Sequence, residues 1–222
     1  MAALYLFLLG LASGIGLLTL SAYRHVSPGW LRWLLMSLGA FVISRYAVLA
    51  AFAAAEDPHR LWVLRHCWLA SSIGLTVPGV FAVDQLVRHP AISAKKLLRW
   101  CSPFLAVYAA VILFGQFTTA QDPWLGWMLH LTSPWHHLLS VVQSVFVLGY
   151  LGLCVLLIRK IPSRPIQTAL AILAVSYGYL GLDGVLLALG RFYFRPFLFS
   201  EMFALLALWH AYETAARLQT AS

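Results

Sequence analysis

The hydrophobic positions of this chain form long apolar runs that are separated by short polar breaks. A helix needs about 20 apolar residues to cross the hydrocarbon core of a bilayer. The breaks contain proline, glycine and charged residues, which mark turns. The pattern therefore predicts an all-α membrane protein, a bundle of seven transmembrane helices in one domain over residues 1–222. The predicted spans are residues 3–22, 30–55, 67–87, 100–117, 137–158, 165–190 and 196–217.

Composition agrees with this class. Hydrophobic residues make up 62% of the chain and charged residues 10%, whereas soluble domains carry about 25% charged residues. A net charge of +8 would suit a nucleic-acid-binding protein. The basic residues, however, lie in short loops between apolar runs, which is the pattern of membrane topology. We therefore expect the lipid bilayer as a partner and no nucleic acid.

The distribution of Lys and Arg predicts the orientation of the bundle. Cytoplasmic loops carry an excess of basic residues. One set of loops carries Arg60, Arg65, Arg191 and Arg195. The other set is far more basic, so the N-terminus is predicted outside and the C-terminus in the cytoplasm. The residues of the basic set are Arg24, Arg32, Arg88, Lys95, Lys96, Arg99, Arg159, Lys160, Arg164 and Arg217.

The longest outer loop, residues 118–137, is rich in tryptophan. Tryptophan favours the boundary between lipid and water. We expect this loop to lie flat in that interface as a short helix.

Three ionisable residues fall inside predicted spans at a similar depth in the outer half: Arg45, Asp183 and Glu201. Charged side chains are expensive in hydrocarbon, so such residues mark functional sites or structural pairs. Both interpretations stay open. Either the base and the acids satisfy one another, or they line a polar cavity that opens to the outside. In the second case we expect them to bind a ligand together with Thr76 and Gln143.

The inner ends of two spans carry further ionisable residues. Asp84 precedes Arg88 by four residues, and Glu213 precedes Arg217 by four. This spacing predicts local salt bridges. His210 lies one turn before Glu213 and is a candidate proton-sensitive group. Asp84, His210 and Glu213 are therefore the candidates for coupling at the inner side.

Small residues predict where helices pack closely. Gly10 and Gly14 form a GxxxG pattern in the first span, and span six carries a glycine stripe at Gly178, Gly181 and Gly184. Both patterns permit close helix contact in membranes.

Histidines gather on the predicted outer side, near acidic residues. Such a group can sense pH or bind zinc or copper. No pair has tight metal spacing, and histidine also suits the membrane interface. The metal therefore stays unknown, and no motif names a cofactor. The candidate ligands are His59, His66, His130, His136 and His137.

The residues 69–87, LASSIGLTVPGVFAVDQLV, and the closing span that runs into AYETAARLQTAS resemble the seven-transmembrane sensor regions of bacterial histidine-kinase-type signalling proteins. That resemblance implies a multi-pass protein of the bacterial inner membrane. It also implies a ligand in the outer half of the bundle and a last helix that passes a shift to a cytoplasmic signalling partner or output domain.

Three functions follow from these features. The first is a sensor or receptor-like module that binds a small molecule. The second is a small-molecule or proton-coupled transporter, because buried acids and Arg45 suit a proton-coupled site. The third is a membrane enzyme that acts on a lipid or quinone, with an acid or a histidine as the catalytic group. The chain lacks GxSxG, HExxH and paired CxxC motifs, and this absence favours the non-enzymatic functions.

Overall fold

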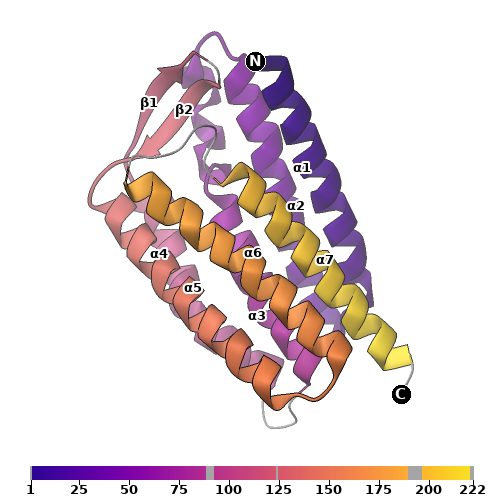
Figure 1. The fold of residues 1–222 in the computed structure, drawn as a ribbon. Coiled ribbons are helices and arrows are strands. Elements are labelled where there is room, and N and C mark those ends of the chain that lie inside the picture. Colours follow the sequence, from indigo (N-terminus) through magenta and orange to yellow (C-terminus); the bar gives the residue numbers. More distant parts are fainter. Residues whose placement is uncertain (1, 89–92, 124, 190–196, 221–222) are drawn as a thin grey trace.

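The computed structural model describes residues 2–88, 93–123, 125–189 and 197–220. Over these residues the chain forms seven α-helices, two short 3₁₀ segments and one β-hairpin (Figure 1). The helices are α1 (Ala2–Ala22), α2 (Gly29–Ala54), α3 (Ala70–Val87), α4 (Ala94–Phe114), α5 (Trp135–Lys160), α6 (Arg164–Ala188) and α7 (Leu198–Thr220). The α-helical class predicted from the sequence is therefore confirmed.

The helix bounds follow the predicted spans, with one clear difference. Helix α4 begins at Ala94, six residues before the predicted start, because Ser93 caps it by accepting a hydrogen bond from Lys96 N at 3.3 Å. Six helical segments are long and apolar enough to cross a membrane, as expected of a multi-pass membrane protein. Helix α7 is not among them in the described part of the chain. Its polar residues lower its hydropathy, so the seventh crossing stays a prediction. The predicted span ends at 190 and 196 lie outside the described residues.

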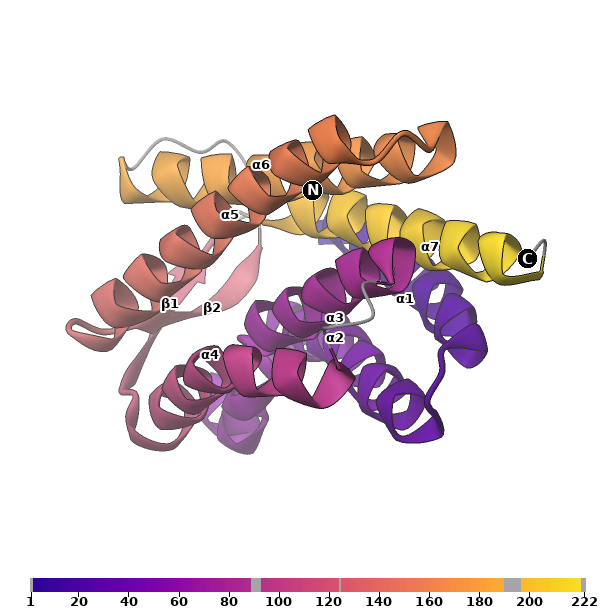
Figure 2. The ribbon, with the colours of Figure 1, turned by 90° about the horizontal axis from the view of Figure 1, so that it is seen from below.

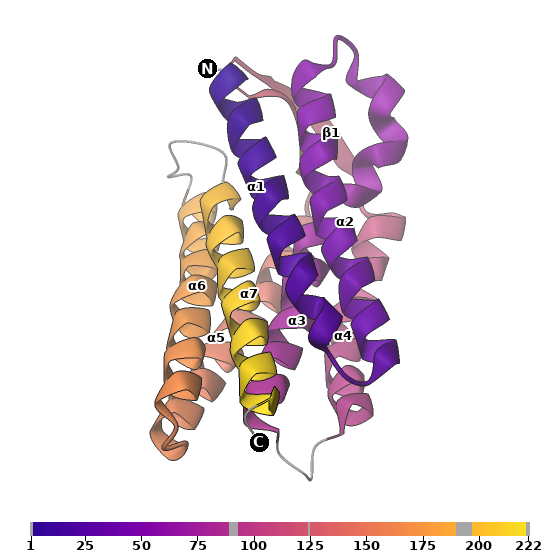
Figure 3. The same cartoon turned by 90° about the vertical axis from the view of Figure 1, so that its right-hand side faces the viewer.

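Helix α3 forms the centre of the bundle. It contacts α2, α4, α5, α6 and α7, and 61% of an 18-residue apolar stretch within Pro58–Val87 is buried, against 11% of such a stretch in α5. Figure 3 shows α2, α1, α7 and α6 side by side around it, and Figure 2 shows α4 and α5 at the periphery. The 3₁₀ segment Pro58–Cys67 leads into α3. The core therefore lies around α3, and lipid faces the outer helices.

The loop that was predicted to form an interfacial helix forms a β-hairpin instead. Strands β1 (Phe117–Asp122) and β2 (Gly126–Leu131) pair antiparallel, with Phe117 opposite Leu131. The Asp122 carboxylate accepts the Leu125 N–H at 3.0 Å and closes the turn. Phenylalanine and threonine in β1 and tryptophan in β2 favour a strand, and backbone pairing satisfies the polar groups that an isolated short helix leaves open at its ends. The hairpin packs on α2 at the N-terminal end of the bundle (Figure 1).

The two ends of the bundle differ in charge. Every predicted cytoplasmic basic residue lies at or near a helix end on the side of the bundle that carries the C-terminus, whereas Arg60 and Arg65 lie at the hairpin end (Figure 1). This separation agrees with the predicted orientation, which itself stays a prediction. Arg191 and Arg195 lie outside the described residues.

The glycine patterns have different roles. A Cβ at Gly181 would lie 2.9 Å from Val147 Cγ1, and one at Gly178 would lie 3.7 Å from Leu151. Two glycines of the α6 stripe, Gly178 and Gly181, therefore face α5, whereas Gly184 faces Phe197. A Cβ at Gly10 or Gly14 would meet nothing within 4 Å. The GxxxG pattern of α1 therefore makes no close helix contact within the described chain.

Candidate functional site

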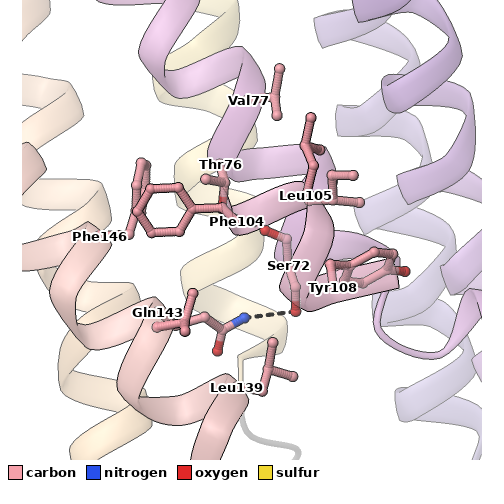
Figure 4. Close-up of a pocket in the computed structure, with 11 residues that line it drawn as sticks. Ser72, Thr76, Val77, Phe104, Leu105, Tyr108, Leu139, Gln143 and Phe146 are labelled. Atoms are coloured by element: carbon pink, nitrogen blue, oxygen red, sulfur yellow. Dashed lines mark hydrogen bonds between the residues drawn. The ribbon is translucent and has the colours of Figure 1, made fainter. Parts of the chain in front are cut away.

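A pocket lies between α3, α4 and α5, nearer to the hairpin end of the bundle (Figure 4). The pocket is small, with a cavity volume of about 20 Å³. This volume is enough for roughly one water, which needs about 10–15 Å³. The lining residues are Ser72, Ile73, Thr76, Val77, Phe104, Leu105, Tyr108, Leu139, Val142, Gln143 and Phe146.

The polar feature of the pocket is a pair of side chains from α3 and α5. Gln143 Nε2 donates to Ser72 Oγ at 2.7 Å, as the dashed line in Figure 4 shows. Thr76 Oγ1 donates to the Ser72 carbonyl at 2.5 Å, so this hydroxyl is already used. The Gln143 carbonyl oxygen and the Ser72 hydroxyl proton have no partner among the described residues. One acceptor and one donor therefore remain open in a mostly apolar pocket.

Aromatic rings close the pocket and connect it to the core. The Phe104 and Phe146 rings meet edge to face, with centroids 5.5 Å apart, and bridge α4 and α5. Phe146 also stacks on Tyr150 at 5.5 Å and meets Tyr177 of α6 at 6.2 Å. One pocket-lining side chain thus contacts two buried tyrosines deeper in the bundle.

These two tyrosines and Tyr212 of α7 form a cluster around one turn of α3, called here the tyrosine cluster. The Tyr150 hydroxyl donates to Gly79 O at 3.0 Å and the Tyr177 hydroxyl to Leu75 O at 2.5 Å. The Tyr212 hydroxyl donates to Pro78 O at 2.8 Å.

Pro78 lies in this turn of α3, although the carbonyl that it leaves without a donor is that of Gly74, to which none of the three tyrosine hydroxyls donates. Proline has no N–H to donate to the carbonyl four residues earlier, and its ring pushes that carbonyl away. In lipid such a disturbed turn is tolerated when neighbouring helices supply hydrogen bonds. Gly79 leaves room for this contact, since a Cβ there would overlap the Tyr177 hydroxyl. Helices α5, α6 and α7 are therefore all fastened to the same turn of α3.

Two of the charged residues predicted inside spans form a buried ion pair. Arg45 Nη1 donates to Glu201 Oε2 at 2.5 Å, and the side chains are 7% and 1% exposed. Arg45 Nε donates to the Trp68 carbonyl at 2.7 Å, and buried Tyr46 lies close to the Glu201 carboxylate. This arrangement joins α2, α7 and the start of α3. Of the two interpretations drawn from the sequence, the one in which buried charges pair with each other therefore holds for Arg45 and Glu201.

Asp183 does not join the ion pair directly. Its Oδ2 accepts the Ser200 hydroxyl at 2.6 Å and the Phe197 N–H at 3.2 Å. It therefore holds the first turn of α7, beside Glu201. The sequence could not predict these partners of Asp183, because it does not show that the end of α6 meets the start of α7.

Tyr108 lies between the ion pair and the pocket. Its ring lines the pocket, while Figure 4 shows its hydroxyl pointing away from Gln143 and Ser72. That hydroxyl is buried, has no hydrogen-bond partner among the described residues, and lies in electrostatic range of Arg45 and Cys67. Sequence reasoning missed Tyr108, because its span gives no sign of which helices it faces.

The predicted ligand-binding residues thus divide into two groups. Thr76 and Gln143 line the pocket, whereas Arg45, Asp183 and Glu201 bond to other protein groups and do not line it.

A scan against protein-family models and a search of the curated proteins find no match.

The two salt bridges that were predicted at the inner ends of the spans do not form. Among the described residues, neither Asp84–Arg88 nor Glu213–Arg217 forms a salt bridge within 4.0 Å. Arg88 ends α3 with φ 47° and so leaves the helical position that the i,i+4 spacing assumes. Asp84 still lies in electrostatic range of Arg88, and it also lies in range of Tyr212 on α7. Glu213 and His210 are partly buried on the same helix.

In the part of the chain that the structure describes, the candidate histidines form no group of three potential metal ligands with one another or with Cys, Asp or Glu. The rings of His136 and His137 lie 5.6 Å apart, and His59 lies beside Trp62 at 6.2 Å. Both arrangements suit aromatic side chains at an interface. His66 is partly buried and His130 is exposed.

Proposed function

We propose that this chain is a receptor-like module of the bacterial inner membrane, which binds a small ligand in the α3–α4–α5 pocket and signals through α7. A cytoplasmic partner or output domain would receive the signal at the basic end. The observation that supports the proposal most directly is the position of Phe146. This side chain lines the pocket and also touches Tyr150 and Tyr177 of the tyrosine cluster.

The cluster supplies a route from the pocket to α7. An occupant that displaces Phe146 must also displace Tyr150 or Tyr177, because packed cores do not deform continuously. These residues hold the α3 turn to which Tyr212 of α7 is bonded. A ligand shifts such an equilibrium only by its difference in affinity for the two arrangements. Contact with Phe146 provides that difference.

The test fills the pocket by mutation, so that no ligand has to be known. Val142→Trp places a large side chain in the pocket, whereas Val141→Trp adds the same group to the neighbouring position, which is 61% exposed. Spin labels at Arg159→Cys on α5 and Arg217→Cys on α7, both exposed positions, report the distance between the inner ends of these helices. The background carries alanine at all three native cysteines.

We expect Val142→Trp to change the α5–α7 distance distribution and Val141→Trp to leave it as in the parent. Adding Tyr212→Phe to Val142→Trp should return the α7 position toward the parent distribution, because the bond that holds α7 to α3 is missing. Ser72→Leu serves as a second filling variant if Val142→Trp folds poorly. Identical distributions in the filled and the control variants would rule out the proposed coupling.

The proton-coupled transporter is less well supported by the described contacts. Both acids are held by protein groups, buried Glu201 by Arg45 and half-buried Asp183 by Ser200 and Phe197 N. An ion-carrying acid needs to exchange its partner during transport, and a fully buried pair with Arg45 opposes such exchange. We therefore place the receptor-like function first.

A further inference from the structure

We infer that the pocket binds the head of a neutral single-chain amphiphile, a long-chain alcohol, which enters sideways from the bilayer between α4 and α5. This inference rests on the proposed function, because it concerns the occupant of the same pocket. The observations that carry it are the open polar atoms of Gln143 and Ser72, the absence of charged residues from the pocket wall, and the position of the pocket at the edge of the bundle.

The polar atoms define the head group. The Gln143 carbonyl oxygen needs a donor and the Ser72 hydroxyl needs an acceptor. An unsatisfied polar group at membrane depth is costly, because hydrocarbon offers it no partner. A single alcohol hydroxyl donates one hydrogen bond and accepts another, so it complements both atoms at once.

The wall defines the charge and the shape of the ligand. None of the eleven lining residues is an acid or a base that is charged at neutral pH. Burying a phosphate or carboxylate there would leave its charge unpaired, which is strongly unfavourable. Only about 20 Å³ is free for the centre of a water molecule. The pocket thus has room for one hydroxyl group but not for a fused ring system, and the chain of the ligand lies outside it.

The location defines the route. Helices α4 and α5 form two of the three walls and lie at the periphery (Figure 2). The Phe104–Phe146 pair closes the side toward the basic end. Exposed Val141, Val145 and Leu148 lie on the opposite face of α5 from Gln143 and are outside this route. With the hydroxyl between Gln143 and Ser72, the alkyl chain of the ligand therefore leaves between α4 and α5, past half-buried Val142, into the lipid.

The test uses the full chain in nanodiscs and two photoactivatable probes. One is a 16-carbon primary alcohol with a diazirine in its chain, and the other is the matching methyl ether, which has no hydroxyl proton to donate. Cross-linked peptides are mapped by mass spectrometry. We expect saturable labelling of α4 and α5 by the alcohol, with about tenfold weaker apparent affinity for the ether, the size of roughly one hydrogen bond in an apolar site.

Variants make the result specific to the pocket. Val142→Trp should abolish saturable labelling, while its control Val141→Trp should keep it. Gln143→Leu should lose the preference for alcohol over ether while the protein keeps its thermal unfolding midpoint within a few degrees. Equal labelling by both probes, or equal labelling of the two tryptophan variants, would overturn the inference. So would the absence of saturable labelling, which would mean that the pocket holds water only.

The result is separable from the signalling proposal. If the alcohol binds but the distance between labelled α5 and α7 does not respond to it or to Val142→Trp, the amphiphile site stands and the receptor function fails. If Val142→Trp moves α7 while the alcohol shows no saturable binding, the coupling stands and the inferred ligand class is wrong.

Discussion

The buried ion pair shows how single residues decide the arrangement of the polar groups. Arg45 joins α2 to α7 through Glu201 and to the start of α3 through the Trp68 carbonyl. Removing two charges from water is costly, and their mutual attraction offsets this cost only when the geometry is good and further hydrogen bonds are made. Here the second hydrogen bond goes to a backbone carbonyl. The pair is therefore best understood as a structural connection next to the pocket.

Arg45→Met should lower the free energy of unfolding in detergent by about 3–5 kcal/mol, because it leaves the Glu201 carboxylate buried and unpaired. The double variant Arg45→Met/Glu201→Leu should recover much of this loss, since no charge then stays buried. Chemical unfolding followed by tryptophan fluorescence measures both.

The matched control for this prediction is Arg60→Ala. Arg60 forms a 3.8 Å pair with Asp57 on the surface, where its side chain is 86% exposed. Its loss should change stability little, because solvent screens exposed pairs. If Arg45→Met behaves like Arg60→Ala, the buried pair is not formed in the detergent-solubilised protein.

At the scale of elements, the hairpin depends on one glycine. Gly126 begins β2 with φ +74°. Residues that carry a side chain rarely adopt this backbone conformation. A Cβ there would also lie 2.6 Å from the Ala53 carbonyl oxygen of α2. The glycine therefore permits both the tight turn and the close approach of the hairpin to α2.

Gly126→Ala should detach the hairpin without unfolding the bundle, because the core lies around α3. Hydrogen exchange of residues 117–131 should become faster, while exchange in α3 and α7 stays unchanged. Ala120→Ser, at an exposed hairpin position, is the control. Unchanged hairpin exchange in Gly126→Ala would mean that the contact with α2 does not hold this segment in place.

At the scale of the whole molecule, the two ends of the bundle carry different chemistry. Basic residues gather at the end with the C-terminus, and the hairpin and Pro58–Cys67 cover the other end (Figure 1). The positive-inside rule places the basic end in the cytoplasm. Helix α7 begins on the side toward the hairpin and finishes at the basic end (Figure 3), so the predicted orientation requires α7 to cross as the seventh span.

Cysteine labelling in intact cells tests the orientation. In a background without native cysteines, Thr118→Cys in the hairpin should react with a membrane-impermeant maleimide. Ser93→Cys and Arg217→Cys should react only after the membrane is permeabilised. All three positions are exposed, so access depends on the side of the membrane. Labelling of Arg217→Cys together with Thr118→Cys in intact cells would show that α7 does not cross.

The sequence by itself predicted the helices and the basic end, and it singled out Gln143 and Thr76, which line the pocket. Helices in lipid must satisfy their own backbone, so the length and hydropathy of each run nearly fix the element. The sequence did not predict that the hydroxyls of Tyr150, Tyr177 and Tyr212 bond to one turn of α3.

Only the tertiary structure decided which polar groups meet. Arg45 pairs with a residue 156 positions away, and Gln143 with one 71 positions away. Depth in the membrane can be read from the sequence, but the rotation of each helix about its axis cannot, because lipid accepts an apolar side chain on any face. That rotation separates Asp183 from Arg45, turns the Tyr108 ring toward Gln143, and thereby forms the pocket.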